Sequence, residues 1–551
     1  MSDATRIIFL GGAGEIGRNM LAIEADGRIL IVDAGLSFPT EEMLGVDLVL
    51  PDFSYLVERA DRCEAIVLTH GHEDHVGALT WLLKEIDVPV YGTPLTLGLA
   101  RKRLDEWRIE PRFVEIAAPD VVDIGPFRVT CIAVSHSIPD AIAVAVDSIG
   151  GRVIYTGDFK LDDSPIDGRR TDLDTFRRLG DEGVDVLLAD STNADHPGRT
   201  GSEGLVGSRL REIFARTEGR IIVACFASNL HRVQQLCDAA EASERLVAFV
   251  GRSMVANVQV GRELGHVKVR DESIIDIGEI DRFPPEKTVV ICTGSQGEPL
   301  SALSLIASGE HKLFTVERGD TVILSASAIP GNESAVFRII NSLYRVGADV
   351  YHGEADGVHV SGHGGTEELV ELLRAVRPRH FVPVHGEYRH MVMHARLAEG
   401  AGIDRSRITI VEDGDVLEFG GGAVRKTEHL DLSMVFVDGL GVGDVGPVVL
   451  RDRRLLAGDG FVLCVVTIDA HSGEVLAGPD LISRGFVFEQ ESRDFLDEAA
   501  DRVADALEAL EQPDDVTDWT VLKRACRRAL GEFVWERTRR RPMIVPVIME
   551  V

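Results

Sequence analysis

The chain has 551 residues, of which 45% are hydrophobic, and a formal net charge of −32 at pH 7. This length and apolar content predict about three domains with buried cores, and no apolar run reaches the ~18 residues of a membrane span. Seven cysteines without a C-x-x-C pair argue against a disulfide scaffold and indicate reduced thiols in a cytoplasm. The acidic balance argues against broad nonspecific binding to duplex nucleic acid, and says little about a confined active site.

A glycine-rich turn follows the first predicted strand. Gly12, Gly14 and Gly17 satisfy the G-x-G-x-x-G pattern of dinucleotide-binding folds. That fingerprint requires a helix next, whereas the residues that follow predict two strands around the hairpin turn Asp26-Gly27. We therefore expect a tight turn whose backbone reaches the functional site, and no dinucleotide site.

The most informative motif is the run VLTHGHEDHVGAL, in which His70, His72, Asp74 and His75 lie within six residues. An apolar run precedes it and an apolar-periodic segment follows, which predicts a strand–loop–helix corner. Residues two apart face the same way in an extended turn, so His70 and His72 can bind one cation while Asp74 and His75 face a second. Because packing and solubility do not require such a cluster, the motif predicts a two-metal site.

Three further metal-competent residues also follow predicted strands. His136 comes after the β-type run 127–134, Asp158 follows a strand and the small residue Gly157, and His385 ends the run HFVPVHGEYRH. Each would be weak evidence alone. Ligands at the ends of several strands suit an open α/β site, because strand ends converge there.

The alternation of strands and helices predicts the domain organisation. The range 1–203 indicates half of an αβ/βα sandwich, and 204–377 indicates an inserted, doubly wound α/β unit. His385 requires the chain to return to the first domain, which 378–425 would complete. The range 426–447 predicts an extended linker, and 448–551 a small α/β C-terminal domain.

The C-terminal domain is predicted to contain strands at 461–470 and 485–489 and a helix at 491–513 that Pro513 ends. An apolar stripe follows this helix, with two interpretations left open: packing on its own sheet, or an oligomer contact. Its members are Leu496, Ala500, Val503, Leu507 and Leu510. A cluster of basic residues follows this helix. It is interpreted as a solvated face or as a counterpart to the acidic helix, and RNA contact is the alternative. The cluster consists of Lys523, Arg524, Arg527, Arg528, Arg537 and Arg539 to Arg541.

Nearly end to end, the chain resembles the β-CASP nucleases of the metallo-β-lactamase superfamily, and among them the ribonuclease J family. The family's first motif resembles Asp33 in ILIVDAG, its second the run from His70 to His75, its third His136 and its fourth Asp158. Asp190 in LLADSTNAD is similar to the acidic residue that opens the β-CASP pattern, and His363 and His385 to its later histidines. The resemblance implies a metallo-β-lactamase αβ/βα sandwich with an inserted β-CASP domain.

The resemblance also implies residue roles. His70, His72 and His136 would hold one Zn²⁺, Asp74, His75 and His385 a second, and Asp158 would bridge them, with Mg²⁺ or Mn²⁺ as further activating ions. His363, Asp190 and Asp74 would be catalytic. A structural Ca²⁺ is expected at Gly45, Asp47 and Asp438. The pocket for the substrate phosphate is expected at Ser228, Asn229, His359, Val360, Ser361, Gly362, His363 and Gly364.

The function that the resemblance implies is 5′-to-3′ exonucleolytic and internal cleavage of single-stranded RNA, with preference for a 5′-monophosphate. The expected role is mRNA decay and rRNA processing in the cytoplasm, by a homodimer or homotetramer that associates with other RNA-decay enzymes and with no membrane. Two alternatives are a small-molecule metallohydrolase for thioesters or lactams, which the inserted domain disfavours, and a non-enzymatic RNA-binding scaffold, which the intact ligand set disfavours.

Overall fold

The structure is a computed structural model that describes residues 4–40, 42–298, 300–329, 332–469, 475–487, 493–510 and 519–551. The chain divides into two compact units, which are described separately. The first consists of Met1–Phe38 and Leu48–Val435, and the second of Pro39–Asp47 and Phe436–Val551. Among the described residues, no helix is both long and apolar enough to cross a membrane.

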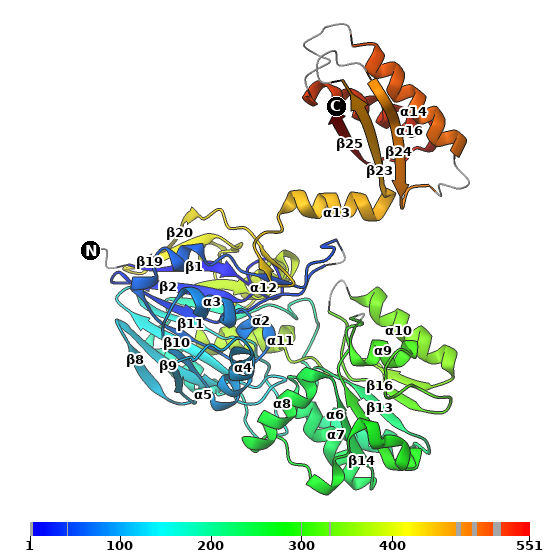
Figure 1. Cartoon of the computed structure of the whole chain (residues 1–551). Coiled ribbons are helices and arrows are strands. Elements are labelled where there is room, and N and C mark those ends of the chain that lie inside the picture. The colour runs from blue at the N-terminus through cyan, green and yellow to red at the C-terminus, as the bar shows by residue number, and fades with distance from the viewer. Residues whose placement is uncertain are drawn as a thin grey trace. The chain divides into compact units, whose positions relative to one another are not determined.

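The first sheet of the larger unit is mixed and contains strands from both the beginning and the end of that unit (Figure 1). The antiparallel hairpin of β2 and β3 turns at Asp26 and Gly27, both of which have positive φ, as the turn sequence predicts. In sheet order the strands are β20 (Ala423–His429), β19 (Asp415–Gly420), β1 (Thr5–Gly11), β2 (Met20–Ala25), β3 (Arg28–Val32), β5 (Cys63–Val67), β6 (Val90–Gly92) and β7 (Phe113–Glu115).

A second sheet packs face to face on the first, and both contribute to one apolar core. This core includes Ile7 and Phe9 of β1 and Val129 of β9, all fully or almost fully buried. The second sheet contains, in order, β18 (His380–Val384), β12 (Val186–Asp190), β11 (Gly151–Tyr155), β10 (Ile142–Ser148), β9 (Phe127–Ala133) and β8 (Val121–Ile124).

Helices cover the outer faces of both sheets and complete the four-layer αβ/βα sandwich that the sequence predicts. The first sheet is covered by α1 (Ser54–Val57), α2 (Glu73–Val76), α3 (Leu79–Glu85) and α4 (Pro94–Glu106). The second is covered by α5 (Leu173–Glu182), α11 (Thr366–Val376) and α12 (Tyr388–Gly400). Thus α11, which the sequence places in the insertion, packs on the sandwich. The short strand β4 spans Leu48–Leu50.

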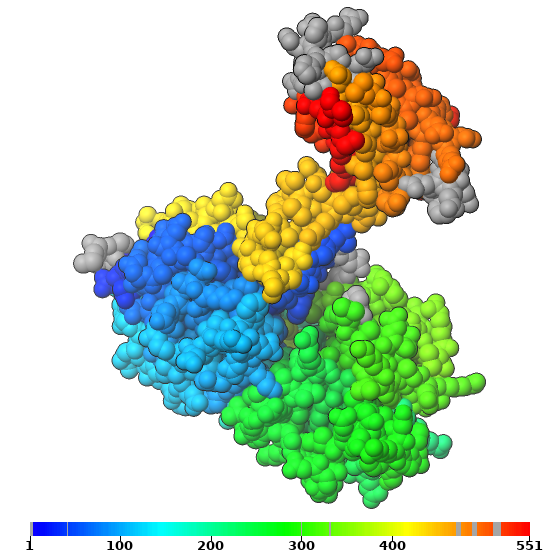
Figure 2. All heavy atoms as spheres, viewed as in Figure 1, coloured from blue at the N-terminus to red at the C-terminus, as the bar shows by residue number. Residues whose placement is uncertain are grey.

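The inserted part is a five-stranded parallel sheet with apolar cores on both faces, as expected for a doubly wound unit. Its strand order is β14 (Leu246–Val250), β15 (Thr288–Cys292), β13 (Ile221–Ala224), β16 (Thr321–Leu324) and β17 (Asp349–His352). Its helices are α6 (Glu203–Arg216), α7 (Leu230–Ala242), α8 (Arg252–Glu263), α9 (Ala302–Ser308) and α10 (Glu333–Val346). The blue-to-cyan and green lobes of Figure 2 are the sandwich and this insertion, which meet where α4 contacts α8.

The smaller unit contains a three-stranded sheet with one face covered by two helices. Its sheet order is β24 (Val475–Arg484), β23 (Phe461–Ile468) and β25 (Met543–Glu550), and its helices are α13 (Pro447–Asp459), α14 (Arg493–Glu508) and α16 (Trp519–Thr538). The predicted strand at 485–489 is wrong in its described part, because 485–487 form a bend after β24. Phe488, Glu489, Glu491, Ser492 and Pro513 lie outside the described residues.

The apolar stripe of α14 lies in the core of its own unit. Leu496, Val503 and Leu507 are buried, and the helix packs on β24 and α16. The stripe therefore serves internal packing, as the first of the two interpretations predicts. Whether the protein forms oligomers stays a prediction. The predicted linker 426–447 contains the end of β20 and the paired strands β21 (Val435–Asp438) and β22 (Gly441–Val442).

Candidate metal centre

Four chain segments bring the predicted ligands to one edge of the sandwich. His70 and His72 follow β5, and the helix α2 carries Asp74 and His75. His136 follows β9, Asp158 follows β11, and His385 directly follows β18. Because strand ends converge at this edge, residues more than 300 positions apart can lie within contact distance.

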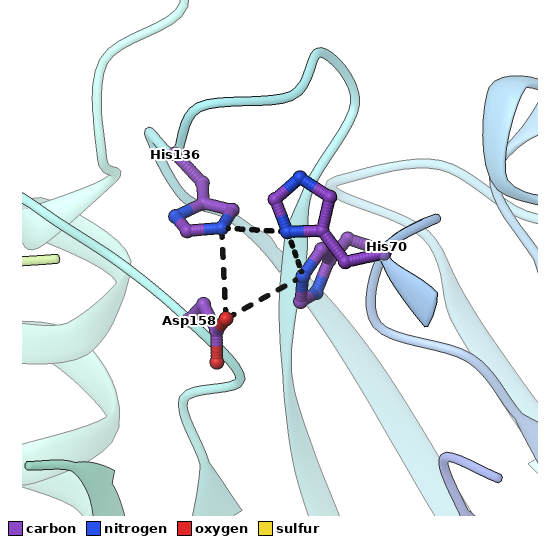
Figure 3. A group of neighbouring side chains, drawn as sticks. His70, His136 and Asp158 are labelled. Carbon is purple, nitrogen blue, oxygen red and sulfur yellow. Dashed lines mark hydrogen bonds and ion pairs between the residues drawn. The ribbon is translucent and has the colours of Figure 1, made fainter. Parts of the chain in front are cut away.

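The first group of donor atoms consists of His70, His72, His136 and Asp158, whose ligand atoms all lie within 4.8 Å of one another. The Nδ1 atom of His72 is 3.1 Å from Nε2 of His70 and 3.1 Å from Nε2 of His136. Both Nε2 atoms are 3.5 Å from Oδ2 of Asp158 (Figure 3). This is the first predicted cation site, with each nitrogen directed inward.

The second group consists of Asp74, His75, Asp158 and His385. The other carboxylate oxygen of Asp158, Oδ1, lies 3.2 Å from Nε2 of His75 and 3.1 Å from Nε2 of His385. Oδ2 of Asp74 is 3.8 Å from each of these nitrogens. Asp158 therefore offers one oxygen to each group, which is the arrangement expected of a bridging carboxylate.

Neighbouring polar groups fix the orientation of the ligand histidines. The Nδ1 atom of His75 is 2.7 Å from the buried carboxylate of Asp33, which also accepts hydrogen bonds from the backbone N–H and hydroxyl of Thr69. The Nδ1 atom of His136 donates to the carbonyl oxygen of Gly362 at 2.8 Å. These contacts direct the opposite ring nitrogens toward Asp158, as supporting groups do around bound metals.

The chemistry of the donor set fits divalent cations. Burial lowers the pKa of His70 and His136 well below the ordinary value, and that of His72 to about 4, so these three imidazoles are uncharged at neutral pH and each has one nitrogen with a free lone pair. Three such nitrogens that converge with a carboxylate oxygen are a donor set that suits Zn²⁺. Oδ1 of Asp158 is also buried and accepts no hydrogen bond within the described part of the chain.

Burial and charge act in opposite directions in the second group. Burial lowers the pKa of His75 and His385, but the surrounding carboxylates, with Asp158 the foremost of them, together outweigh it and raise both. Burial raises the pKa of Asp158, but the surrounding imidazoles His385, His75 and His70 hold it well below its ordinary value. The site thus keeps an ionised carboxylate at its centre and favours positive charge around it.

A third group joins His363 to the centre. Its ligand atoms lie within 4.8 Å of those of Asp158, Asp190 and His385. The Nδ1 atom of His363 is 2.8 Å from Oδ2 of Asp190, which is buried. Burial lowers the pKa of His363, but the carboxylate of Asp190, together with those of Asp158 and Asp74, outweighs it and raises that pKa to about 9. His363 therefore carries a proton at neutral pH, with its Nε2 edge free of this carboxylate.

The loop 359–364 is tied to the ligands at both ends. The carbonyl of Gly362 contacts His136, as described above, and the N–H of Gly364 donates to the carbonyl of Phe159, next to Asp158. A Cβ atom on Gly362 would lie 2.7 Å from the His136 ring, so no larger residue fits there. The hydroxyl of Ser361 accepts hydrogen bonds from the Asn193 side chain at 2.9 Å and from the N–H of His363 at 3.2 Å.

Comparison with known proteins gives family matches over both units. Residues 13–203 match the metallo-beta-lactamase superfamily, and residues 350–407 match the Zn-dependent metallo-hydrolase RNA specificity domain. Residues 218–343 match the ribonuclease J beta-CASP domain, and residues 448–551 match the ribonuclease J C-terminal domain. The chain belongs to the ribonuclease J family. The family predicted from the sequence motifs is thereby confirmed, together with the fold class.

Named relatives extend over almost the whole chain. Ribonuclease J of Mycolicibacterium smegmatis is 47% identical over 99% of this chain and 97% of its own length. Ribonuclease J of Mycobacterium tuberculosis is 46% identical over 100% and 98%, and ribonuclease J2 of Bacillus subtilis is 41% identical over 100% and 99%. A solved structure of a protein of unknown function from Enterococcus faecalis shares the fold, with a TM-score of 0.52 and 15% identity over 76% of this chain and all of that chain.

Sequence reasoning missed Lys160, a buried lysine beside the centre. Its ammonium donates to the carbonyl oxygens of Gly201 and Ser361, each at 3.2 Å, and lies 3.7 Å from Asp162. The signal was its position two residues after Asp158, where a strand end directs alternate side chains to the same side. Lys160 is therefore a link between the Asp158 segment and the loop 359–364.

Ser228 and Asn229, which are predicted to assist the phosphate pocket, are linked to the loop 359–364 through Arg232. Asn229 caps α7, its side-chain oxygen accepting from the N–H of Arg232 at 2.9 Å, and Ser228 precedes this cap. The fully buried Arg232 donates in turn to the carbonyl of Val358 at 2.8 Å, just before the loop. His359 is buried beside it, and burial together with the charges of Arg232 and Lys160 lowers its pKa to about 3.

The turn of Gly12, Gly14 and Gly17 behaves as predicted. All three glycines have positive φ, a strand follows the turn, and the carbonyl of Gly12 accepts a hydrogen bond from the N–H of His385 at 2.8 Å. No helix follows to support a bound pyrophosphate. The glycine turn therefore positions a metal-ligand candidate through its backbone.

The residues predicted to hold a structural cation lie together in the smaller unit, with an arginine among them. The guanidinium of Arg453 pairs with Asp438 and donates to the carbonyl of Leu44 at 2.9 Å, and a Cβ atom on Gly45 would lie 2.7 Å from it. Asp47 accepts from the N–H of Gly439 at 2.8 Å. A Ca²⁺ at this place stays a prediction, because Arg453 already supplies positive charge to Asp438.

Proposed function

We propose that the protein is a metal-dependent ribonuclease that degrades single-stranded RNA from its 5′ end and also cuts internally. The observation that carries this proposal is the pair of donor groups that share Asp158, with the His363–Asp190 pair at their edge. Family membership supports a nuclease, and the match to an RNA specificity domain supports RNA as its substrate.

The metals in this proposal are two Zn²⁺ ions, with Mg²⁺ or Mn²⁺ as further activating ions. His70, His72 and His136 would hold one, Asp74, His75 and His385 the other, with Asp158 shared. When bound, two such ions acidify a water molecule and neutralise charge on a phosphodiester. The protein's own contribution is a rigid set of buried donors, oriented by Asp33 and by the carbonyl of Gly362.

His363 is the proposed general acid. Its contact with Asp190 fixes the ring and holds a proton on the imidazole at neutral pH. That proton can be donated from Nε2 to the 3′ oxygen that leaves when the phosphodiester bond breaks. Asp190 acts through His363 and is a positioning residue, whereas Asp74 lies at the second donor group.

The loop 359–364 is the proposed pocket for the 5′-monophosphate. The N–H groups of His363 and Gly364 already donate within the protein. The hydroxyl of Ser361 and the other amides of the loop are short donors of the kind that close around a phosphate. Because this loop contacts His136 and Phe159, the pocket lies close to the donor groups. We infer that a phosphate held there lies about one nucleotide from the metals, in which case mononucleotides would be released stepwise from the 5′ end.

Two other functions receive less support. A small-molecule hydrolase has no use for the large inserted domain or for the loop 359–364. A non-enzymatic RNA-binding scaffold would not require the full set of inward-directed donors. We further propose a cytoplasmic enzyme that forms homodimers or homotetramers and works beside other RNA-decay enzymes in mRNA decay and rRNA processing.

The test compares one RNA sequence with a 5′-monophosphate, a 5′-triphosphate or a 5′-hydroxyl. We expect the monophosphorylated RNA to be degraded fastest, because a triphosphate is too bulky and a hydroxyl leaves donors unpaired. Ser361→Ala should reduce this preference about tenfold while internal cuts persist. Asp158→Asn should remove most cleavage and bound zinc, measured by elemental analysis, without unfolding the protein.

Ser208→Ala, which removes an exposed hydroxyl on α6, is the matched control. Degradation from the 3′ end, or equal rates for the three termini, would contradict the proposed pocket. Full zinc content and near wild-type cleavage in Asp158→Asn would contradict the proposed bridge.

A further inference from the structure

The helix α16 carries a strongly basic face on a strongly acidic chain. Between residues 523 and 541 there are eight basic and two acidic residues, whereas the whole chain has a formal net charge of −32. Arg524, Arg528 and Trp535 follow one another at helical spacing and are exposed. Their opposite face, including Leu530 and Phe533, is buried on the sheet.

The neighbouring acidic helix does not neutralise this face. Two ion pairs link α14 to α16 within the described residues, Glu498–Arg537 at 2.6 Å and Arg502–Glu536 at 4.0 Å, so one basic residue of α16 is used. In the described part of the chain, no ion pair to a carboxylate is formed by Lys523, Arg524, Arg527, Arg528, Arg539 or Arg541. The interpretation as a counterpart of the acidic helix therefore accounts for Arg537 alone.

An exposed indole ring lies among these basic residues. The guanidinium groups of Arg541 and Arg539 lie 4.5 Å and 5.5 Å from the ring centre of Trp535, which is 37% exposed. At the start of the helix, the ammonium of Lys523 lies 5.2 Å from the ring of Trp519, which is 43% exposed. Aromatic faces among unpaired cations are the combination that binds single-stranded nucleic acid, by base stacking and phosphate contacts.

We infer that the basic face of α16 and the residues that directly follow the helix form a second binding surface for single-stranded RNA, defined by Lys523, Arg524, Arg527, Arg528, Trp535, Arg539 and Arg541. The surface belongs to the smaller unit, whereas the donor groups belong to the larger unit, and its proposed role is to bind a long substrate during cleavage. The inference rests on the proposed function for the identity of the nucleic acid. An acidic protein would fit the charge, but would leave the exposed indole between two guanidiniums without a role.

The first experiment measures binding. An unstructured RNA of about 40 nucleotides is titrated with the full-length protein in excess EDTA, so that cleavage does not interfere. We expect Arg524→Glu/Arg528→Glu and Trp535→Ala each to weaken binding by about tenfold, the first with a shallower dependence on salt concentration. The matched control is Arg451→Glu/Arg454→Glu, which makes the same charge change at exposed positions of α13 in the same unit.

The second experiment measures cleavage by the metal-loaded protein. For the long RNA, the α16 variants should raise KM by about tenfold and leave kcat unchanged, whereas an RNA of about 8 nucleotides should be cleaved as by the wild type. Unchanged binding and KM for long RNA would overturn the inference, whether or not an acidic protein is found at this face. Absence of any RNA cleavage by the wild type would instead contradict the proposed function, and the binding experiment would still decide the inference.

Discussion

At the scale of single residues, the two donor groups are held in place by residues that are not themselves donors. Asp33 is fully buried and fixes His75, while the carbonyl of Gly362 fixes His136. Each of these contacts determines which imidazole nitrogen faces Asp158. The donor groups are therefore preorganised by hydrogen bonds from segments that are distant in sequence.

A titratable group near the glycine turn makes stability depend on pH. Burial and the nearby charge of Glu15 raise the pKa of Asp413 from 3.8 to about 7, against the opposing effects of Arg18 and the N–H of Ala13. The unfolded chain releases this proton near pH 4 and the folded chain near pH 7. The folded state thus binds more protons in this window, and this contribution to the free energy of unfolding decreases as pH rises through it.

Asp413→Asn should remove that dependence. The free energy of unfolding of the wild type relative to this variant should fall by about 1–2 kcal/mol between about pH 4 and pH 7, a moderate value because the Asp413 side chain is 21% exposed. Urea unfolding at several pH values measures it, with the exposed Asp281→Asn as control. A constant difference between Asp413→Asn and the wild type across this window would contradict the raised pKa.

At the scale of elements, the sequence predicts most of the site because its motifs stand at strand ends. His70, His136, Asp158 and His385 each follow an apolar run that forms a buried strand, and parallel or mixed sheets bring such ends together. The hairpin at Asp26 and the turn after Gly12 were predictable for similar local reasons. The local sequence was sufficient to predict these elements, because the spacing of apolar residues and the turn residues determine their conformation.

Other features depend on contacts that no local pattern contains. The helix α11 packs on the sandwich because its apolar face meets α5 and α12, although the adjacent segment belongs to the insertion. Residues 485–487 have the composition of a strand, but β24 has already ended at Arg484. The role of Lys160 could not be predicted locally, because its ammonium contacts Ser361, which is distant in the sequence.

Lys160 is expected to hold the phosphate loop in place. Lys160→Met removes two charge-assisted hydrogen bonds from a buried ammonium to backbone carbonyls and should destabilise the protein by about 2 kcal/mol, as measured by denaturant unfolding. It should also raise KM for 5′-monophosphorylated RNA about tenfold and change kinetics with 5′-hydroxyl RNA much less, because the donors around Ser361 shift. Lys84→Met, on α3, is the control. Equal losses for both RNA termini would show that Lys160 has a purely structural role.

At the scale of the whole molecule, the smaller unit exposes the face of its sheet that the helices leave uncovered. Leu463 of β23 is directly paired with Ile482 of β24 and Val545 of β25, so the three side chains lie on one face. Ile482 and Val545 are 40% and 36% exposed, whereas the alternate residues Val462 and Cys464 are buried under α14 and α16. An apolar row on an open sheet face is a typical contact between protein chains.

The predicted homo-oligomer should therefore form through this sheet face rather than through the stripe of α14. Ile482→Lys/Val545→Lys should shift the protein toward monomer in light scattering, because a C2 interface would place these charges opposite their own copies. Cleavage of a short RNA should persist, since both substitutions lie outside the unit that carries the donor groups. Asp501→Lys, at an exposed position of α14, controls for added charge.

An unchanged particle mass for the sheet variant, accompanied by a smaller mass after deletion of Val448–Val551, would place the contact elsewhere in the C-terminal domain. An unchanged mass in both would place it in the larger unit.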